Sequence, residues 1–338
     1  MTGQLCLVVE EMQAWTSRPL DRSTLSSGQE LDDMIPALHG VLPVAPTVFN
    51  DDESLDLPGQ RRVTEFLIDA GSAAICVLAN YSEQFSLTDS ERVQVLEATL
   101  DQAAGRVPVI ATTSAYSARI ARDRSLDAQR RGAAMVMLMP PFFGTTITVA
   151  DAAVRNYFRT VADGLDIDIM VQDAPMSPTR LSVELLASLA LEIPHIRHAK
   201  IEMPRTAAKV RALIAAAGDT LPGVYDGEEA VTLIPDLDAG VSATMSSAVI
   251  PEVLARIVAD FHAGRRDQAV EEWERILPLI HYENRQCGLA AAKLLLYRGG
   301  VIGSARCRAP FPDLAPVVAA ELEQLAIRKD ARVLRWAK

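Results

Sequence analysis

A lysine and a carboxylate two residues apart are the first candidates for chemistry in this chain. The segment from Ile196 to Glu202 reads Ile-Arg-His-Ala-Lys-Ile-Glu, a short run that predicts a buried strand. Because side chains alternate between the two faces of a strand, His198, Lys200 and Glu202 are expected to share one face. If that face is interior, an amine and a carboxylate meet in an enclosed space that suits covalent and acid–base chemistry.

Burial would change the chemistry of the Lys200 amine. Taking an ammonium group out of water lowers its pKa, and we expect the pKa of Lys200 to fall from about 10.4 to about 7 to 8, a change on the order of 4 kcal/mol. The free amine could then attack a ketone and form a Schiff base. The alternative is a lysine on the outer face of the strand that points to helices or solvent, as most lysines do.

Two acids are candidates for moving protons beside Lys200. Glu202 is expected to act as a general acid or base, and the alternative is that it only pairs with Lys200 or Arg205. Glu229 belongs to a Tyr-Asp-Gly-Glu-Glu segment that follows a predicted strand. The alternative for Glu229 is a helix N-terminus, where the helix dipole favours an acid. The spacing alone leaves both alternatives open.

Repeated strand–helix units must position these residues. From residue 40 onward, short apolar runs alternate with longer segments rich in Ala, Leu, Glu and Arg, which is the pattern of parallel strands joined by helices. Eight such units predict an α/β fold of the TIM (β/α)8 barrel type, with extra C-terminal helices and an active site at the C-terminal ends of the strands. The predicted strands are Val41–Thr47, Ala74–Ala79, Val107–Thr112, Met135–Met139, Ile167–Gln172, Ile196–Ile201, Gly223–Asp226 and Val241–Met245.

The chain divides into three predicted parts. Residues 1–35 are irregular and rich in hydroxyl side chains, so we expect a flexible N-terminal extension. Residues 36–262 are expected to form the barrel. Residues 263–338 are helical in pattern and are expected to form a C-terminal helical region, packed on the barrel or on a partner subunit.

The composition excludes several classes of function. The net charge of −11 and the absence of a Lys/Arg run argue against a nucleic-acid partner. No apolar stretch reaches the roughly 18 residues that span a membrane, and the N-terminus lacks the basic segment of a signal peptide. The four cysteines show no C-x-x-C spacing, so neither a metal site nor a redox pair is predicted. We therefore expect a cytoplasmic protein that acts on a small molecule without a metal.

Several motifs occur in a fixed order along residues 40–310. They are Thr47-Val48-Phe49 with Leu55-Asp56, Ala79-Asn80-Tyr81-Ser82-Glu83 with Leu87-Thr88 and Glu91-Arg92, Pro141-Phe142-Phe143, Lys200, and Arg308-Ala309-Pro310. This set resembles the dihydrodipicolinate synthase/N-acetylneuraminate lyase family of class I aldolases and dehydratases. The resemblance implies that Lys200 is the Schiff-base lysine and that no dissociable cofactor is needed. It also implies a homotetramer built as a dimer of dimers.

The resemblance also implies a substrate-binding set. The turn Asn80–Ser82 is expected to bind the carboxylate of a 2-keto acid through backbone N–H groups and the Ser82 hydroxyl, with a further hydroxyl from Tyr81. Gln172 and Gly227 are expected to line the same site. Glu229 stands where family members that use sugar acids hold substrate hydroxyls.

Three departures from the family pattern narrow the activity. Gln172 stands where the family carries its catalytic tyrosine, and Phe142 and Phe143 replace a pair of tyrosines. The arginine of true dihydrodipicolinate synthases is unmatched, with Ser177 nearest to it. Dihydrodipicolinate synthase activity is therefore not favoured.

The remaining pattern resembles the family branch that contains L-2-keto-3-deoxyarabonate dehydratase. The implied reaction is Schiff-base dehydration of a 2-keto-3-deoxy sugar acid to 2,5-dioxopentanoate, with Lys200, Glu202 and Glu229 as catalytic groups. One alternative is a pyruvate-dependent aldolase that cleaves the same sugar acids. Another is a catalytically silent ligand-binding relative, which would form no borohydride-trapped adduct.

Overall fold

The computed structural model describes residues 35–144 and 149–338, and residues 35–338 form one compact unit. All eight strands are parallel and follow one another in the order β1-β8-β7-β6-β5-β4-β3-β2. Backbone hydrogen bonds from Ala45 N to Cys76 O (2.8 Å) and from Cys76 N to Pro43 O (2.9 Å) join the first strand region to the second. The sheet therefore closes on itself, which confirms the predicted TIM barrel. The strands are β1 (Gly40–Val41), β2 (Ile75–Val77), β3 (Val109–Thr112), β4 (Met135–Leu138), β5 (Asp168–Asp173), β6 (Ile196–Ile201), β7 (Gly223–Asp226) and β8 (Ala243–Thr244).

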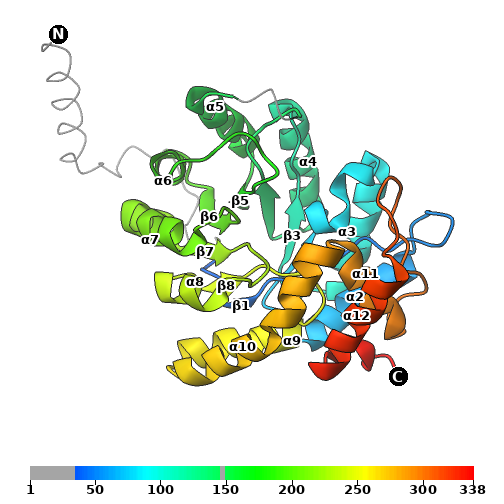
Figure 1. Cartoon of the computed structure of the whole chain (residues 1–338). Helices are drawn as coiled ribbons and strands as arrows, with labels where there is room; N and C mark the ends of the chain where they lie inside the picture. The colour runs from blue at the N-terminus through cyan, green and yellow to red at the C-terminus, as the bar shows by residue number, and fades with distance from the viewer. Residues whose placement is uncertain (1–34, 145–148) are drawn as a thin grey trace, which may run out of the picture. The chain divides into compact units, whose positions relative to one another are not determined.

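Helices follow the strands and surround the barrel, as the ribbon in Figure 1 shows. They are α2 (Leu57–Asp69), α3 (Asp89–Ala103), α4 (Ala118–Arg131), α5 (Asp151–Ala162), α6 (Val183–Glu192), α7 (Thr206–Ala217), α8 (Leu233–Ala239) and α9 (Pro251–His262). Three more helices, α10 (Arg266–Tyr282), α11 (Ala290–Arg298) and α12 (Pro316–Arg328), contact one another beyond α9. Short 3₁₀ turns are η3 (Asn80–Ser82), η4 (Gln84–Ser86), η5 (Gly218–Thr220) and η7 (Arg332–Leu334), and η6 (Glu283–Cys287) is a π-helix.

The ends of α3 and β1 follow from local sequence. Thr88 caps α3 through a reciprocal capping box with Glu91. The first strand is shorter than the predicted Val41–Thr47, because Pro43 and Pro46 have no N–H group to donate to a neighbouring strand. Beyond β1, the pairing continues through a bridge between Val44 and Cys76 on one side and through the hydrogen bond from Val44 N to Ser246 O (2.7 Å) on the other.

The segment ahead of the first strand is held to the floor of the barrel. The predicted extension 1–35 lies outside the described residues except for Ile35. The Ile35 amide donates to Asp168 Oδ2 (3.0 Å), and the Leu38 amide donates to the Tyr225 hydroxyl (3.1 Å). His198 connects these two acceptors, with Nδ1 2.7 Å from the Tyr225 oxygen and Nε2 3.2 Å from Asp168 Oδ2. This buried network closes the end of the barrel at which the strands begin, opposite to their C-terminal ends.

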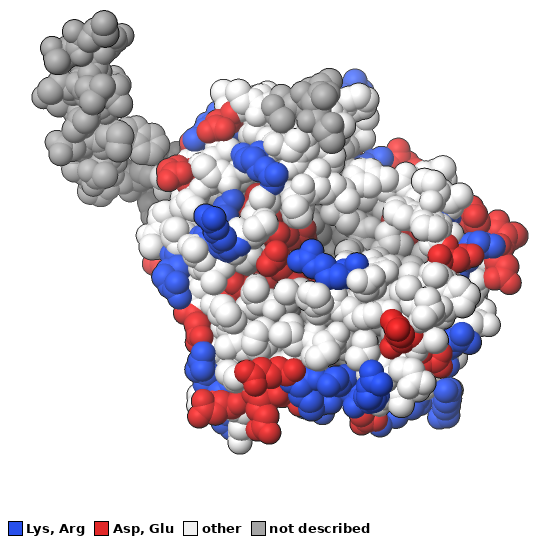
Figure 2. Space-filling model, viewed as in Figure 1, with Lys and Arg blue, Asp and Glu red and all other residues white. Residues whose placement is uncertain are grey.

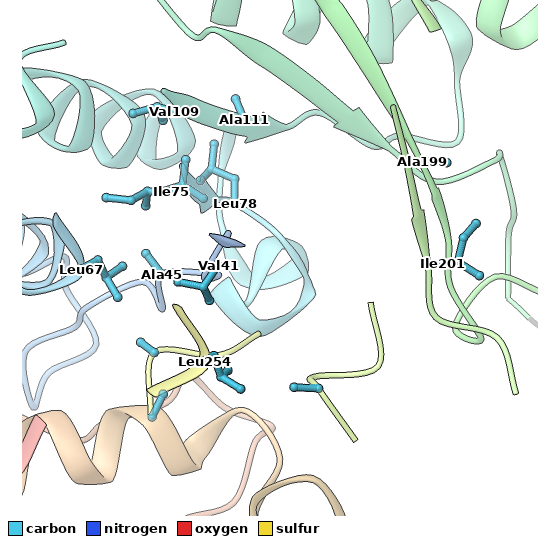
Figure 3. Close-up of a cluster of buried hydrophobic side chains, with 14 of the residues drawn as sticks. Val41, Ala45, Leu67, Ile75, Leu78, Val109, Ala111, Ala199, Ile201 and Leu254 are labelled. Carbon is cyan, nitrogen blue, oxygen red and sulfur yellow. The ribbon is translucent and has the colours of Figure 1, made fainter. Parts of the chain in front are cut away.

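The apolar core has two layers. Figure 3 shows part of the larger one, which includes strand residues such as Ile75 and Val109 together with Leu67 of α2 and Leu254 of α9. The smaller layer fills the inside of the barrel and includes Met135, Met137 and Met170. Both layers are almost completely removed from water. These side chains therefore fill the inside of the barrel, and the cavity described below lies at the C-terminal ends of the strands.

A buried ion pair connects the C-terminal helices to the barrel. Lys293 of α11 pairs with Glu83, and the side chains of both are almost fully buried. The other oxygen of Glu83 accepts a hydrogen bond from the Arg308 amide (2.8 Å), and the Arg308 guanidinium pairs with Glu91. The Phe49 ring lies 4.3 Å from Lys293 Nζ and 4.4 Å from Arg308 Cζ. Several motifs that carry the family resemblance thus meet in one structural cluster.

Breaking this pair is expected to destabilise the fold. Lys293→Met leaves the Glu83 carboxylate buried without its cation, which typically costs about 3–5 kcal/mol. Chemical denaturation should show a loss of that size in the free energy of unfolding. The matched control is Arg61→Met, because the Arg61–Asp101 pair is 40% and 65% exposed and should contribute about 1 kcal/mol or less. Equal losses in the two variants would contradict the structural role of the buried pair.

Candidate active site

A cavity of about 490 Å³ opens at the C-terminal ends of the strands. Its volume suits a small organic molecule. The hollow near the centre of the face in Figure 2 contains acidic side chains, with basic ones beside it. The lining residues include Asn80, Tyr81, Gln172, Lys200, Glu202, Arg205, Gly227, Glu228, Glu229, Asn284 and Arg285.

Lys200 lies in this cavity at the end of β6. His198 and Lys200 both point into the barrel, as the alternation along the strand predicts, because His198 contacts Tyr225 while Lys200 lines the cavity. The Lys200 side chain is 4% exposed, and its Nζ pairs with Oε1 of Glu202, the first residue after the strand. Gln172 Nε2 donates to the same Glu202 oxygen (2.8 Å). The predicted amine and carboxylate are therefore side by side, and Gln172 holds the carboxylate in place.

The prediction that burial lowers the pKa of Lys200 is wrong for this arrangement. Burial does lower the pKa of Lys200, but the neighbouring acids, the ion-paired Glu202 foremost, outweigh it, so the net shift is upward. The resting amine is therefore an ammonium paired with a carboxylate. Any attack by this nitrogen requires a proton transfer first, and Glu202 is the adjacent acceptor.

Glu229 is a buried carboxyl that also lines the cavity. Its backbone has a positive φ of 56°, followed by Ala230 at 65°, which turns the chain sharply after β7. Asp226 fixes this turn by accepting hydrogen bonds from Glu228 N (2.9 Å) and Ala230 N (3.1 Å). Thr244 donates to the same Asp226 side chain (2.6 Å). The turn leads into a loop rather than directly into a helix, so Glu229 is not an ordinary helix-start acid.

The environment of Glu229 favours its neutral form. Burial raises the pKa of Glu229 well above its ordinary value, Lys200 opposes this shift, and the acids Glu283 and Glu202 add to it. Oε2 of Glu229 has no hydrogen-bond partner within the part of the chain that the structure describes. A protonated carboxyl with a free oxygen beside a lysine–carboxylate pair can act as a general acid.

Gly227 is a glycine because the active-site pair lies against it. A Cβ atom at this position would lie 2.5 Å from Glu202 Cγ and 2.8 Å from Lys200 Cγ. It would also lie 3.0 Å from the Ile201 carbonyl oxygen, which belongs to the backbone.

Gly227→Ala is therefore expected to displace the Lys200–Glu202 pair. A displacement near 1 Å can cost on the order of 100-fold in rate, so we expect a fall in kcat of roughly 10- to 100-fold in a steady-state assay. Gly303→Ala is the matched control, since a Cβ there meets no atom within 4 Å. Wild-type kcat in Gly227→Ala would show that the pair tolerates the contact.

The turn after β2 only partly follows the prediction. Asn80 and Tyr81 line the cavity, and the Tyr81 hydroxyl donates to Asn284 Oδ1 (3.4 Å). Ser82 is fully buried, and its hydroxyl donates to the Ala45 carbonyl (2.6 Å) while its amide donates to Ala79 (2.9 Å). The Ser82 hydroxyl therefore supports the loop from β1 and is not part of the cavity lining, and its predicted role in substrate binding stays a prediction.

Two lining residues from the C-terminal region were absent from the predicted site. Asn284 and Arg285 belong to the π-helix η6 and reach the cavity from beyond α10. The sequence around them reads as a continuous helix, and periodicity carries no sign of a π-turn. Arg205, named above only as a pairing partner for Glu202, also lines the cavity and is the N-cap residue that precedes α7, with a φ of 69°.

The described residues contain neither a group of metal ligands nor a membrane-spanning helix. Within residues 35–144 and 149–338, no group of His, Cys, Asp and Glu side chains is arranged to hold a metal ion. No helix in these ranges has the length and apolar character needed to cross a membrane. The groups in the cavity that can do chemistry are the side chains that line it.

The fold and the site define a class of protein, a (β/α)8 barrel with a lysine–carboxylate pair in its mouth. The model of the dihydrodipicolinate synthetase family matches residues 37–328, and the chain belongs to that family. This confirms the resemblance found in the sequence. Dihydrodipicolinate synthase from Rhodopseudomonas palustris superposes with a TM-score of 0.79 at 26% identity, over 86% of this chain and 97% of that one.

Curated relatives differ in how similar they are to this chain. L-2-keto-3-deoxyarabonate dehydratase from Azospirillum brasilense is 48% identical over 302 residues, which cover 89% of this chain and 98% of that protein. A 4-hydroxy-tetrahydrodipicolinate synthase from Nitrosococcus oceani is 26% identical over 267 residues, 78% of this chain and 89% of the relative. The dehydratase is thus the more similar of the two by a wide margin.

Proposed function

We propose that this protein is a Schiff-base lyase that dehydrates a 2-keto-3-deoxy sugar acid, such as L-2-keto-3-deoxyarabonate, to 2,5-dioxopentanoate. The observation that carries the proposal is the buried pair of Lys200 and Glu202 in the same cavity as the buried Glu229. This site offers a nucleophile, a base and an acid in one small cavity. The 48% identity to a dehydratase that uses this substrate supports the choice of substrate.

The first stage is the formation of the Schiff base. Glu202 accepts a proton from the Lys200 ammonium, and the free amine attacks C2 of the substrate ketone. Glu202 then returns its proton to the C2 oxygen, the carbon–oxygen bond at C2 breaks, one water leaves, and a protonated imine remains beside the regenerated Glu202 carboxylate. The substrate carboxylate is placed towards Asn80 and Tyr81 at the end of β2.

The second stage removes the hydroxyl group at C4. Glu202 takes a proton from C3, and the electron pair forms an enamine that pushes out the C4 oxygen. Glu229 gives its proton to that oxygen, so the group leaves as water rather than as hydroxide. A proton is lost from C5 and one is gained at C3, and tautomerisation converts the C5 alcohol carbon to an aldehyde. Hydrolysis of the imine then releases 2,5-dioxopentanoate and frees Lys200.

Two tyrosines of the family's proton relay are replaced in this chain, and the Tyr81 hydroxyl, which does line the cavity, donates to Asn284. Gln172 holds Glu202 at the position where the family carries a catalytic tyrosine, and Phe143 is 63% exposed. This arrangement favours a carboxylate as the proton carrier and argues against dihydrodipicolinate synthase activity. Lys200, Glu202 and Glu229 together form a set of reactive side chains that a catalytically silent ligand-binding relative would not need.

Product analysis distinguishes the remaining alternatives. The enzyme is incubated with 2-keto-3-deoxypentonate, and the products are separated by chromatography with mass detection. We expect a five-carbon semialdehyde. Pyruvate with glycolaldehyde would instead identify an aldolase, and unchanged substrate would support a ligand-binding protein.

Assembly and location are separate proposals. We propose a homotetramer, as the family resemblance implies, and a location in the cytoplasm, as the spacing of the cysteines indicates. An exposed aromatic cluster of Phe85, Tyr116 and Phe143 supports association, because such side chains usually pack against a partner. Sedimentation analysis tests the assembly, with a tetramer as the expected species and a monomer as the contrary result.

A further inference from the structure

Most polar side-chain donors in the cavity are already bound to another group of the protein. The donors engaged in this way are the side chains of Tyr81, Gln172, Lys200, Thr232 and Asn284. The amide nitrogen of Asn80 donates only to the Met139 sulfur, at 4.0 Å. A bound anion has to find donors of its own, because a charge taken out of water without partners costs free energy.

The turn after β2 offers the substrate carboxylate few free donors. The Ser82 hydroxyl donates to the Ala45 carbonyl (2.6 Å), and the Ser82 amide donates to the Ala79 carbonyl (2.9 Å). Both groups are therefore engaged, and the turn itself contains no cationic side chain. A carboxylate placed towards Asn80 and Tyr81 needs a positively charged partner from another segment.

Two arginines that line the cavity are free to provide that partner. Within residues 35–144 and 149–338, neither Arg205 nor Arg285 makes an ion pair or a side-chain hydrogen bond. The remaining cation of the cavity, Lys200, is paired with Glu202. A guanidinium group matches a carboxylate through two parallel hydrogen bonds, so a free arginine is well suited to bind one.

The position of Arg285 favours it over Arg205. Arg285 directly follows Asn284 in the π-helix η6, and Asn284 Oδ1 accepts a hydrogen bond from the Tyr81 hydroxyl (3.4 Å). This bond joins η6 to the turn towards which the substrate carboxylate is placed. Arg205 instead follows Glu202 by three residues, on the segment that removes the C3 proton in the proposed mechanism. The π-turn is itself a feature that is frequent at functional sites.

We propose that Arg285 binds the substrate carboxylate and makes the site selective for anionic 2-keto acids over neutral ketones. The inference rests on the proposed function, because the proposed substrate carries a carboxylate beside its ketone carbon. The cavity also contains the acidic side chains of Glu202 and Glu228, whose negative charge disfavours an anion. Arg285 offsets this charge and takes no part in proton transfer.

Two ketones of similar size test the selectivity. Pyruvate has a carboxylate where hydroxyacetone has a neutral CH2OH group, and an imine of either ketone is trapped with cyanoborohydride. Mass spectrometry gives the rate of adduct formation with each, and the ratio of the two rates is compared between variants. Arg285→Gln should lower the preference for pyruvate by about tenfold, the factor typical of a hydrogen bond to a charged group. Arg285→Lys keeps the charge and should restore part of the preference.

Two other arginines provide the controls. Arg328 of α12 is exposed, has no side-chain partner among the described residues and lies outside the cavity lining. Arg328→Gln should keep the ratio within about twofold of the wild-type value. Arg205→Gln removes the same charge from the same cavity and should lower the ratio less than Arg285→Gln does. An equal fall in these two variants would show that overall charge selects the anion, and it would overturn the inference.

The ratio is measured without any dehydration, so the two proposals can fail separately. A lowered ratio in Arg285→Gln, with a wild type that forms no semialdehyde, would support the carboxylate site and refute the proposed function. An unchanged ratio, or an equal loss of rate with both ketones, would overturn the inference. If the wild type forms no adduct, titration calorimetry with pyruvate decides. Binding about tenfold weaker in Arg285→Gln is then expected, and equal binding or none would overturn the inference.

Discussion

Replacing Lys200 with arginine is expected to abolish turnover. The arginine preserves the ion pair with Glu202, but its guanidinium stays protonated and cannot condense with a ketone. We expect kcat to fall on the order of 10⁴-fold or more, since loss of a covalent nucleophile removes the whole pathway. Borohydride treatment in the presence of pyruvate or hydroxypyruvate should add no mass to this variant, whereas the wild type should gain a reduced adduct.

Another ion-paired lysine provides the control for this result. Lys209 pairs with Asp173 (2.6 Å) and does not line the cavity. Lys209→Arg should keep adduct formation and retain kcat within about tenfold. A trapped adduct of wild-type yield in Lys200→Arg would mean that another nitrogen attacks the substrate, and the proposed mechanism would fail.

Replacing Glu202 with glutamine is expected to allow Schiff-base formation on Lys200 but to slow the loss of the C4 hydroxyl group. Without the carboxylate, the burial of Lys200 is opposed by less negative charge, so the pKa of Lys200 falls from its raised value. The amine becomes available more readily and the borohydride adduct should still form. Proton removal from C3 loses its base, however, and kcat should fall by about 10²- to 10⁴-fold.

Glu192→Gln is the control variant, because it also removes a carboxylate from an ion pair but lies outside the cavity. Glu192 of α6 pairs with Arg155 and Arg159 at 2.6 Å each. Glu192→Gln should leave kcat near the wild-type value, because exposed pairs contribute little to stability. If Glu202→Gln turned over at a similar rate to Glu192→Gln, the carboxylate would only be a structural partner of Lys200, which is the alternative left open by the sequence.

Most of the barrel could be predicted because its strands are buried on both faces. The limits of β6 agree with the predicted Ile196–Ile201, and its alternation correctly places Lys200 inside. The first strand was overestimated because apolar composition outweighed the two prolines, which cannot donate hydrogen bonds. Local pattern thus predicts which face a residue takes more reliably than it predicts where pairing stops.

The site was harder to predict because its properties depend on distances between distant segments. The sequence indicates that Lys200 is buried, but the sign of its pKa shift depends on how close Glu202 and Glu229 come to it. A serine such as Ser82 could hydrogen-bond a ligand, yet its hydroxyl donates to the Ala45 carbonyl instead. Asn284 enters the cavity only through the π-turn of η6. None of these contacts is encoded in local spacing.

Peptide mapping of the borohydride-trapped adduct is the most direct test of the central claim. The chain contains only five lysines, Lys200, Lys209, Lys293, Lys329 and Lys338, so the modified residue can be assigned without ambiguity. The account predicts that the reduced 2-keto acid is found on the peptide that carries Lys200 and on no other. An adduct on a different lysine, or no adduct under conditions in which the enzyme consumes its substrate, would contradict it.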